Sequence, residues 1–247
     1  EKFYALLVMM IGAINGVGCA LDICNLWVWF EVMTISSIVL VAFYKDQAAS
    51  LEAGVKYLIQ SATGSVMVVI GIAFIFLETG TLNIEMLRMS ITSPSPFLII
   101  GGALIVIGFG VKIAMVPLHT WLPDAHSQAP SGISAMLSGI VIEVGLIALL
   151  RALGGIALSG GRWGYLLIGF GVLNMIVGNL LALRQKEVKR MLAYSSLSHV
   201  GYMLLGFGVL ISLNGLMAGV GAIFHLITHG LMKSLAFFAA GVFLYNF

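Results

Sequence analysis

Ionisable side chains lie inside apolar stretches of this sequence, where burying them is costly. Glu31 follows the segment LWVWF, and Glu143 has no charged residue within seven positions on either side. A charge at the centre of a membrane-spanning helix costs about 2.5–3.5 kcal/mol on insertion scales. Side chains kept at that cost are expected to do chemistry, and acids, lysines and histidines suit proton transfer. The candidates for a proton relay are Glu31, Lys112, Glu143, His199, His225, His229 and Lys233.

Three of these candidates are spaced i, i+4 and i+8 in the segment HLITHGLMK. His225, His229 and Lys233 would therefore share one face of a helix. Histidine titrates near neutral pH, so such a face suits a relay, as does His199 among the serines of AYSSLSHVGYM. Two alternatives stay open, which are hydrogen bonding that only serves packing and a zinc-binding His pair. Zinc is disfavoured because no third ligand is nearby and Lys233 would repel a cation.

A proline follows Lys112 closely and predicts a broken helix. Proline has no backbone N–H, and the ring of Pro117 would clash with the carbonyl group four residues earlier. The apolar segment 97–116 should therefore break within about one turn of Lys112. Irregular backbone inside a membrane is tolerated only against protein or water, and transport proteins use it. The polar segment after the break adds the supporting candidates His119, Asp124 and His126. The alternative for Lys112 and for Glu31 is a side chain that extends to the membrane surface.

Composition places the chain in a membrane. It is 60% hydrophobic and 9% charged, whereas a soluble domain has about 25% charged residues. Its 30 glycines lie inside apolar runs, where they let helices approach closely. A net charge of +2 gives no argument for nucleic acid. We expect no cofactor or metal in this chain, because no ligand set for haem or an iron–sulfur cluster is present. Cys19 and Cys24 are expected to be small buried residues.

Eight membrane spans of about 20 residues each predict an all-α polytopic protein. The loop 78–96 is the longest polar connection and has room for a short interfacial helix. The predicted spans are 3–21, 25–44, 54–77, 97–116 with an extension to 126, 130–152, 163–183, 189–211 and 215–245.

Lysine and arginine positions predict the orientation, because cytoplasmic loops are enriched in them. Seven of these residues fall on the side of Arg190 and three on the other, so the first span should start inside and the segment from His119 to His126 should lie at the inner face. Five spans, residues 1–153, are expected to form one unit. The spans in 163–247 would begin a second unit, inverted because five is odd. Both chain ends look cut, so we expect the middle of a longer protein.

Four blocks of the sequence resemble the antiporter-like membrane subunits shared by respiratory complex I, Mrp-type sodium/proton antiporters and membrane-bound energy-converting hydrogenases. These blocks are WFEVMTISS, VKIAMVPLHTWLPDAHSQAPSGISAMLSG, RQKEVKRMLAYSSLSHVGYM and HLITHGLMKSLAFFAAG. The resemblance implies fourteen spans in a full subunit, with spans 4–8 and 9–13 as inverted repeats. This chain would then cover about spans 4 to 11. The second block favours the hydrogenase and Mrp-like branch over a quinone-reducing complex.

The resemblance also implies roles for single residues. Glu31 is similar to the acid of span 5, and Lys112 to its partner, the lysine of broken span 7. His199 is similar to the span 10 histidine, and His225 and His229 to the relay of span 11. One departure is Glu143, because many members have a lysine there; the carboxylate could pass protons or help to coordinate Na⁺.

The function implied is an ion-translocating subunit, non-catalytic itself, in a redox-driven complex of a bacterial, archaeal or energy-converting organelle membrane. It would move H⁺, with Na⁺ exchange as a variant, and its partner subunits would hold the redox centres. Two alternatives remain. One is a stand-alone secondary cation/proton antiporter, and the other is a structural membrane subunit without an ion path.

Overall fold

The computed structural model describes residues 1–91, 93, 95–156 and 162–246, and these ranges contain helices and no strand. Residues 92 and 94 of the predicted loop 78–96, and Phe247 of the predicted unit 163–247, lie outside the described residues. The all-α fold class is confirmed. The helices are α1 (Lys2–Cys19), α2 (Ile23–Val41), α3 (Ala48–Thr79), α4 (Ile84–Ser90), α5 (Pro96–Lys112), α6 (Trp121–Gln128), α7 (Ser131–Met136), the π-helical turn η1 (Leu137–Val141), α8 (Ile142–Ile156), α9 (Arg162–Leu183), α10 (Val188–Leu213) and α11 (Leu216–Asn246).

The helices agree with the predicted spans. Within the described ranges, seven helices are long and apolar enough to cross a membrane, with Ser131–Ile156 counted as one, and Pro96–Lys112 is a shorter apolar helix. Together they match the eight predicted spans. The short helix α4 lies in the predicted loop 78–96, where an interfacial helix was expected. The protein is thus an integral, multi-pass membrane protein.

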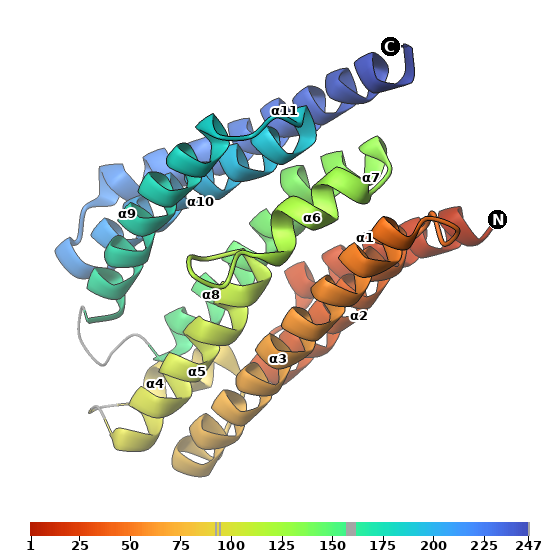
Figure 1. Cartoon of the computed structure of the whole chain (residues 1–247). Helices are drawn as coiled ribbons and strands as arrows, with labels where there is room; N and C mark the ends of the chain where they lie inside the picture. The colour runs from red at the N-terminus through yellow and green to blue at the C-terminus, as the bar shows by residue number, and fades with distance from the viewer. Residues whose placement is uncertain (92, 94, 157–161, 247) are drawn as a thin grey trace.

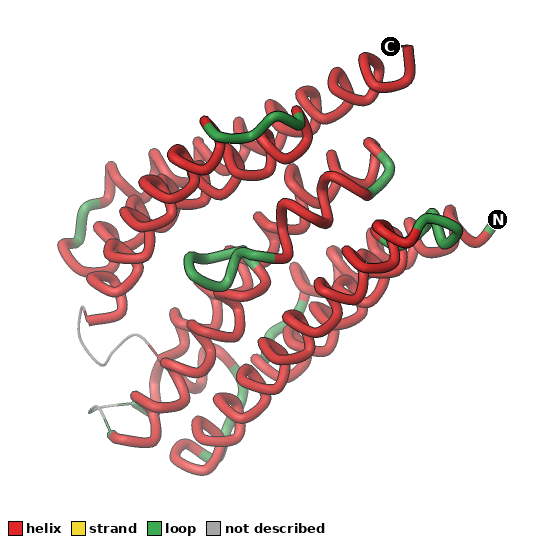
Figure 2. The backbone as a smooth tube through the Cα atoms, viewed as in Figure 1, coloured by secondary structure: helices red, strands yellow, loops and turns green. Residues whose placement is uncertain are grey.

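Three groups of helices lie side by side (Figure 1). Helices α5 to α8 lie between α1–α3 on one side and α9–α11 on the other. Helix α3 packs along α5, α7 packs against α11, and α6 contacts both α3 and α10. Figure 2 shows the loop between α5 and α6 in the middle of the molecule. The break predicted after Lys112 therefore contacts helices of both outer groups, through Thr120 to α3 and through Val116 to α9.

Glycines allow the closest helix pairs to form. A Cβ atom on Gly171 of α9 would lie 2.8 Å from the carbonyl oxygen of Gly201 in α10. A Cβ atom on Gly64 of α3 would lie 2.8 Å from the carbonyl oxygen of Gly108 in α5. Any larger residue would push these backbones apart, and tight packing is a main source of helix association in lipid.

Polar residues begin several of the helices. Asp22 accepts a hydrogen bond from the N–H of Asn25 at 2.7 Å, and Asn83 accepts from the first turn of α4. Ser95 accepts from the N–H of Leu98 at 3.2 Å, with Pro96 at the first helical position. The first turn of a helix has unpaired N–H groups, so these side chains fix where α2, α4 and α5 start.

The expectation for the cysteines is wrong for Cys19. Cys19 is exposed, Cys24 is half-buried, and both are free thiols. Helix α1 buries one narrow stripe, formed by Met10, Ala13 and Val17. Cys19 is two positions beyond Val17 and therefore points away from that stripe.

Candidate functional site

Lys112 is buried against α2, where it forms an ion pair with Glu31. The Lys112 Nζ atom lies 3.0 Å from Oε1 of Glu31 and 3.5 Å from Oγ1 of Thr34. The side chain of Lys112 is 2% exposed and that of Glu31 is 21% exposed. The alternative that Lys112 extends to the membrane surface is therefore wrong. A buried ammonium group needs a counter-charge and further oxygen atoms, and α2 supplies both. We call Lys112 and Glu31 the central pair.

The helix break lies beside this pair. Helix α5 ends at Lys112, and residues 113–120 form turns instead of a helix. Ala114 has a φ angle of 56°, in the left-handed region. The predicted break is confirmed, and it begins at Ile113, four residues before Pro117. The physical reason is that the proline ring excludes the preceding carbonyl groups from a regular helix, so the preceding turn cannot continue.

Trp121 closes the end of the broken helix. Its Nε1–H donates to the carbonyl oxygen of Val111 at 2.8 Å, and its ring stacks on Tyr57 with 4.0 Å between ring centres. The backbone N–H of Trp121 donates to Oε1 of Gln60 at 3.1 Å. The carbonyl groups at the end of a helix lack their regular partners, and the Val111 oxygen is shared here by the Trp121 indole and the Ala114 N–H at 3.2 Å.

Glu143 meets a histidine from α11. The turn η1 comes directly before α8, and Glu143 is the second residue of that helix. Its Oε1 atom lies 2.9 Å from Nδ1 of His229, which is fully buried. A Cβ atom on Gly230 would lie 2.8 Å from the carboxylate, so glycine leaves room for it. Glu143 looks isolated in the sequence because its partner is 86 residues away.

The histidines form a cluster with Glu143. Nδ1 of His199 in α10 lies 3.0 Å from Nε2 of His225 in α11. The ring centres of His199 and His229 are 5.1 Å apart. A neutral imidazole has one donor and one acceptor nitrogen, so a proton can pass between the hydrogen-bonded rings of His199 and His225 by exchange of tautomers. We call these four residues the histidine cluster: Glu143, His199, His225 and His229.

Lys233 lies one turn further along α11. Its Nζ atom donates to Oγ of Ser195 at 2.8 Å and to the carbonyl oxygen of Leu192 at 3.3 Å, both in α10. The predicted common face of His225, His229 and Lys233 thus contacts α8 and α10. No group of three or more His, Cys, Asp or Glu residues that could hold a metal ion is found in the part of the chain that the structure describes.

The central pair and the histidine cluster do not touch. Over the described residues, no hydrogen bond or ion pair joins Lys112 to Glu143. Ile113, the residue after Lys112, packs against Gly145, two residues after Glu143, where an added Cβ would be 2.8 Å from the Ile113 side chain. The seven candidates therefore form two contact groups and the neighbouring Lys233, not one unbroken chain of contacts.

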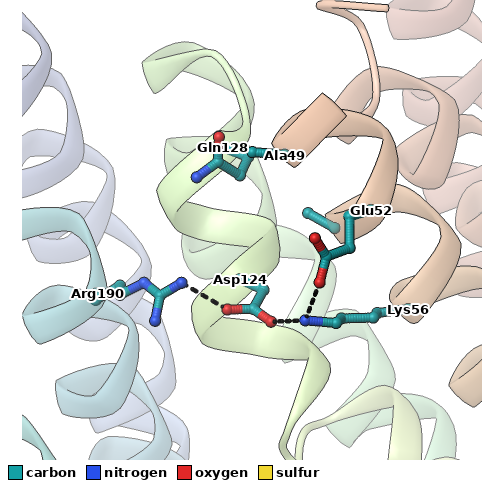
Figure 3. A pocket seen from close by; sticks show the side chains of 7 residues that line it. Ala49, Glu52, Lys56, Asp124, Gln128 and Arg190 are labelled. Atoms are coloured by element: carbon teal, nitrogen blue, oxygen red, sulfur yellow. Dashed lines mark hydrogen bonds and ion pairs between the residues drawn. The ribbon is translucent and has the colours of Figure 1, made fainter. Parts of the chain in front are cut away.

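The supporting candidates lie around the break. His126 is fully buried and stacks on Phe237 with 4.7 Å between ring centres, and His119 lies edge-on to Tyr194. Asp124 binds Lys56 of α3 at 2.9 Å and Arg190 of α10 at 2.7 Å (Figure 3). These charges border a small pocket of about 70 Å³, lined by Ala49, Glu52, Ala53, Lys56, Asp124, Gln128 and Arg190.

Sequence reasoning missed Asn174 in α9. This residue is fully buried, and its Oδ1 atom accepts a hydrogen bond from the N–H of Val116 at 2.8 Å. Its Nδ2 atom points to the carbonyl oxygen of Leu197 at 3.4 Å. The available signal was an amide in the middle of an apolar span, where a polar side chain needs a partner.

An all-helical membrane protein with a broken helix and buried acid, lysine and histidine contacts falls in the class of membrane transport proteins. Residues 20–247 match the family described as "NADH:quinone oxidoreductase/Mrp antiporter, TM", and the chain belongs to this family. This confirms the resemblance seen in the four sequence blocks.

Relatives and solved structures agree with this assignment. The chain is 37% identical over 191 residues to NADH-quinone oxidoreductase subunit N of Deinococcus radiodurans, covering 74% of this chain and 39% of that protein. It is 35% identical over 227 residues to hydrogenase-4 component B of Escherichia coli, covering 87% and 33%. A chain of the Mrp complex from Dietzia sp. DQ12-45-1b superposes with a TM-score of 0.85 at 26% identity, covering 96% and 44%. The chain thus spans less than half the length of these proteins.

Proposed function

We propose that the chain is part of an ion-translocating subunit of a redox-driven membrane complex. The observation that supports this best is that buried charges inside the membrane spans contact one another. A packing role alone would not require the acid–lysine contact of 3.0 Å and the acid–histidine contact of 2.9 Å. The residues proposed to pass protons are Glu31, Lys112, Glu143, His199, His225, His229 and Lys233.

In this proposal the central pair acts as an electrostatic switch. The carboxylate of Glu31 stabilises the protonated form of Lys112, and moving the two apart removes that stabilisation. The lysine can then release its proton toward the histidine cluster. The break at residues 113–120 gives Lys112 the freedom to change partners, since the helix that holds it ends at Lys112 itself.

The proton path would cross two units of the chain. Residues 1–153 form the first unit and 163–247 the beginning of a second, inverted one. In support, the second helix of each unit contains a candidate, Glu31 in α2 and His199 in α10, and packs along the helix before it. An inverted repeat places binding groups near the middle of the membrane in many transporters.

Partner subunits would supply the driving reaction. Both relatives cited above are named as a subunit or component of a larger enzyme. We propose that the redox centres lie in such partners and that this chain is a non-catalytic translocation subunit. The ion would be H⁺, and the similarity to a chain of an Mrp complex favours Na⁺/H⁺ exchange as the second candidate.

The test is Lys112→Ala in the full-length subunit, assembled in its complex and reconstituted in liposomes that contain a pH-sensitive dye. Proton uptake per complex should fall about 100-fold, the scale expected for loss of a proton-transfer group. Lys45→Ala is the control, because Lys45 is an exposed lysine in a turn. Normal uptake by Lys112→Ala would favour a structural subunit instead. Uptake by the purified single subunit would favour a stand-alone antiporter.

A further inference from the structure

The irregular segment 113–120 needs partners for its backbone N–H groups, because the membrane interior offers no bulk solvent. The N–H groups of residues 113, 114, 115 and 118 donate to carbonyl oxygens of residues 109–115, at 2.6–3.2 Å. Pro117 has no N–H to satisfy. The N–H of Val116 has no such local acceptor.

Val116 is held from another helix. Oδ1 of Asn174 in α9 accepts the Val116 N–H at 2.8 Å, while Nδ2 of the same amide points to the carbonyl oxygen of Leu197 in α10. Asn174 is fully buried, so its amide is committed to these two groups. Leu197 precedes His199 by two residues. One amide thus joins the helix break beside Lys112 to the helix of the histidine cluster.

A second contact, made by α10, reaches the first turn of α6, directly after the broken segment. Asp124 in the first turn of α6 accepts from Arg190 at 2.7 Å, and Lys56 of α3 binds its other oxygen (Figure 3). The stretch from Val116 to Asp124 is therefore attached to α9 ahead of Pro117 and to α10 after Trp121, where α6 begins. We call Asn174 and Arg190 the brace.

We propose that the brace positions the broken segment, and through it Lys112, for ion transfer. This proposal rests on the proposed function. Asn174 and Arg190 are positioning residues, because neither touches Lys112 or Glu31 and each acts through the segment it holds. A displacement of α10 at His199 would reach the central pair through Leu197, Asn174 and Val116. Such a physical link supplies the coupling between two groups of side chains that do not contact each other.

The test uses Asn174→Leu, which replaces the amide by an apolar side chain of similar size. In the full-length subunit within its complex, we expect the number of protons moved per electron transferred to fall about fivefold. Asn179→Leu in the same helix is the matched control, because Asn179 is exposed. Asn174→Thr keeps an oxygen atom as an acceptor and should recover part of the ratio.

A second variant guards against failure of the first to assemble. Arg190→Gln removes one end of the brace while Lys56 still binds Asp124, and the ratio should fall in the same direction. The ratio separates positioning from scaffolding, since a scaffold defect lowers the amount of complex and leaves the ratio unchanged. An unchanged ratio in both variants, with Lys112→Ala inactive in proton uptake, would overturn the brace alone. Normal uptake by Lys112→Ala would overturn the proposed function and the brace with it.

Discussion

The ammonium group of Lys112 lies 3.0 Å from the carboxylate of Glu31, although 81 residues separate them in the chain. The two side chains neutralise each other within the membrane spans. Breaking a buried pair by removing one partner costs about 3–5 kcal/mol, whereas replacing both by apolar groups is often neutral. The stability and the transport function of this pair can therefore be separated.

The first prediction uses that difference. Glu31→Leu alone should lower the thermal stability of the purified complex, because it leaves the Lys112 ammonium without its counter-charge. Glu31→Leu combined with Lys112→Met should restore most of the stability and still fail to move protons. Differential scanning fluorimetry and dye-based proton uptake measure the two effects. Recovery of uptake in the double variant would contradict the role of the pair.

The second prediction concerns Glu143. Glu143→Gln keeps a group that can hydrogen-bond to His229 but loses the titrating carboxylate, so the complex should assemble normally. Proton uptake should fall about 100-fold if the carboxylate passes protons. Glu85→Gln in α4 is the control, since Glu85 is exposed and outside the spans. Unchanged uptake in Glu143→Gln would remove Glu143 from the path.

The third prediction tests how the end of α5 is held. Trp121→Phe keeps an aromatic ring over Tyr57 but deletes the Nε1–H that binds the Val111 carbonyl oxygen. The Val111 carbonyl oxygen keeps the Ala114 N–H as a partner at 3.2 Å, so the loss is that of one hydrogen bond, about 0.5–1.5 kcal/mol, and the unfolding temperature should fall. Trp29→Phe provides a comparison at a half-exposed tryptophan. Equal unfolding temperatures for the two variants would argue against the role of the indole N–H.

The fourth prediction compares two glycines of the same helix. A Cβ on Gly171 would lie 2.8 Å from the carbonyl oxygen of Gly201, while nothing lies within 4 Å of a Cβ on Gly169. Gly171→Ala should destabilise the protein by about 1–3 kcal/mol through overpacking, and Gly169→Ala should not. Thermal unfolding in detergent distinguishes them. If the two alanine variants unfold alike, α9 and α10 do not approach each other closely at Gly171.

Hydropathy predicts most of the fold, because membrane spans leave a continuous apolar signal. The eight spans, the short helix in loop 78–96 and a break near Lys112 follow from apolar runs, turn residues and Pro117. The predicted span 97–116 extends past the end of α5 at Lys112, because the proline ring excludes the carbonyl group four residues before it from a regular helix. Nothing in the sequence indicated the turn η1, which has no composition of its own.

The types of the site residues could be predicted, but their partners could not. Glu143 was recognised as a buried charge, yet its contact with His229 depends on the packing of α7 and η1 against α11. His225, His229 and Lys233 were placed on one face correctly because a single helix fixes their spacing. Asn174 was missed because its role is to satisfy an N–H of a distant irregular segment. Only the three-dimensional arrangement shows which backbone groups need such a partner.

The turn η1 determines the direction in which the side chains of the following helix α8 point. A π-helical turn adds one residue to a helix, and one residue corresponds to about 100° of rotation. Without that extra residue, Glu143 would face a different neighbour and His229 would lose its acid. Deleting one residue within Leu137–Val141 would therefore turn Glu143 away from His229, although no residue of the histidine cluster is substituted.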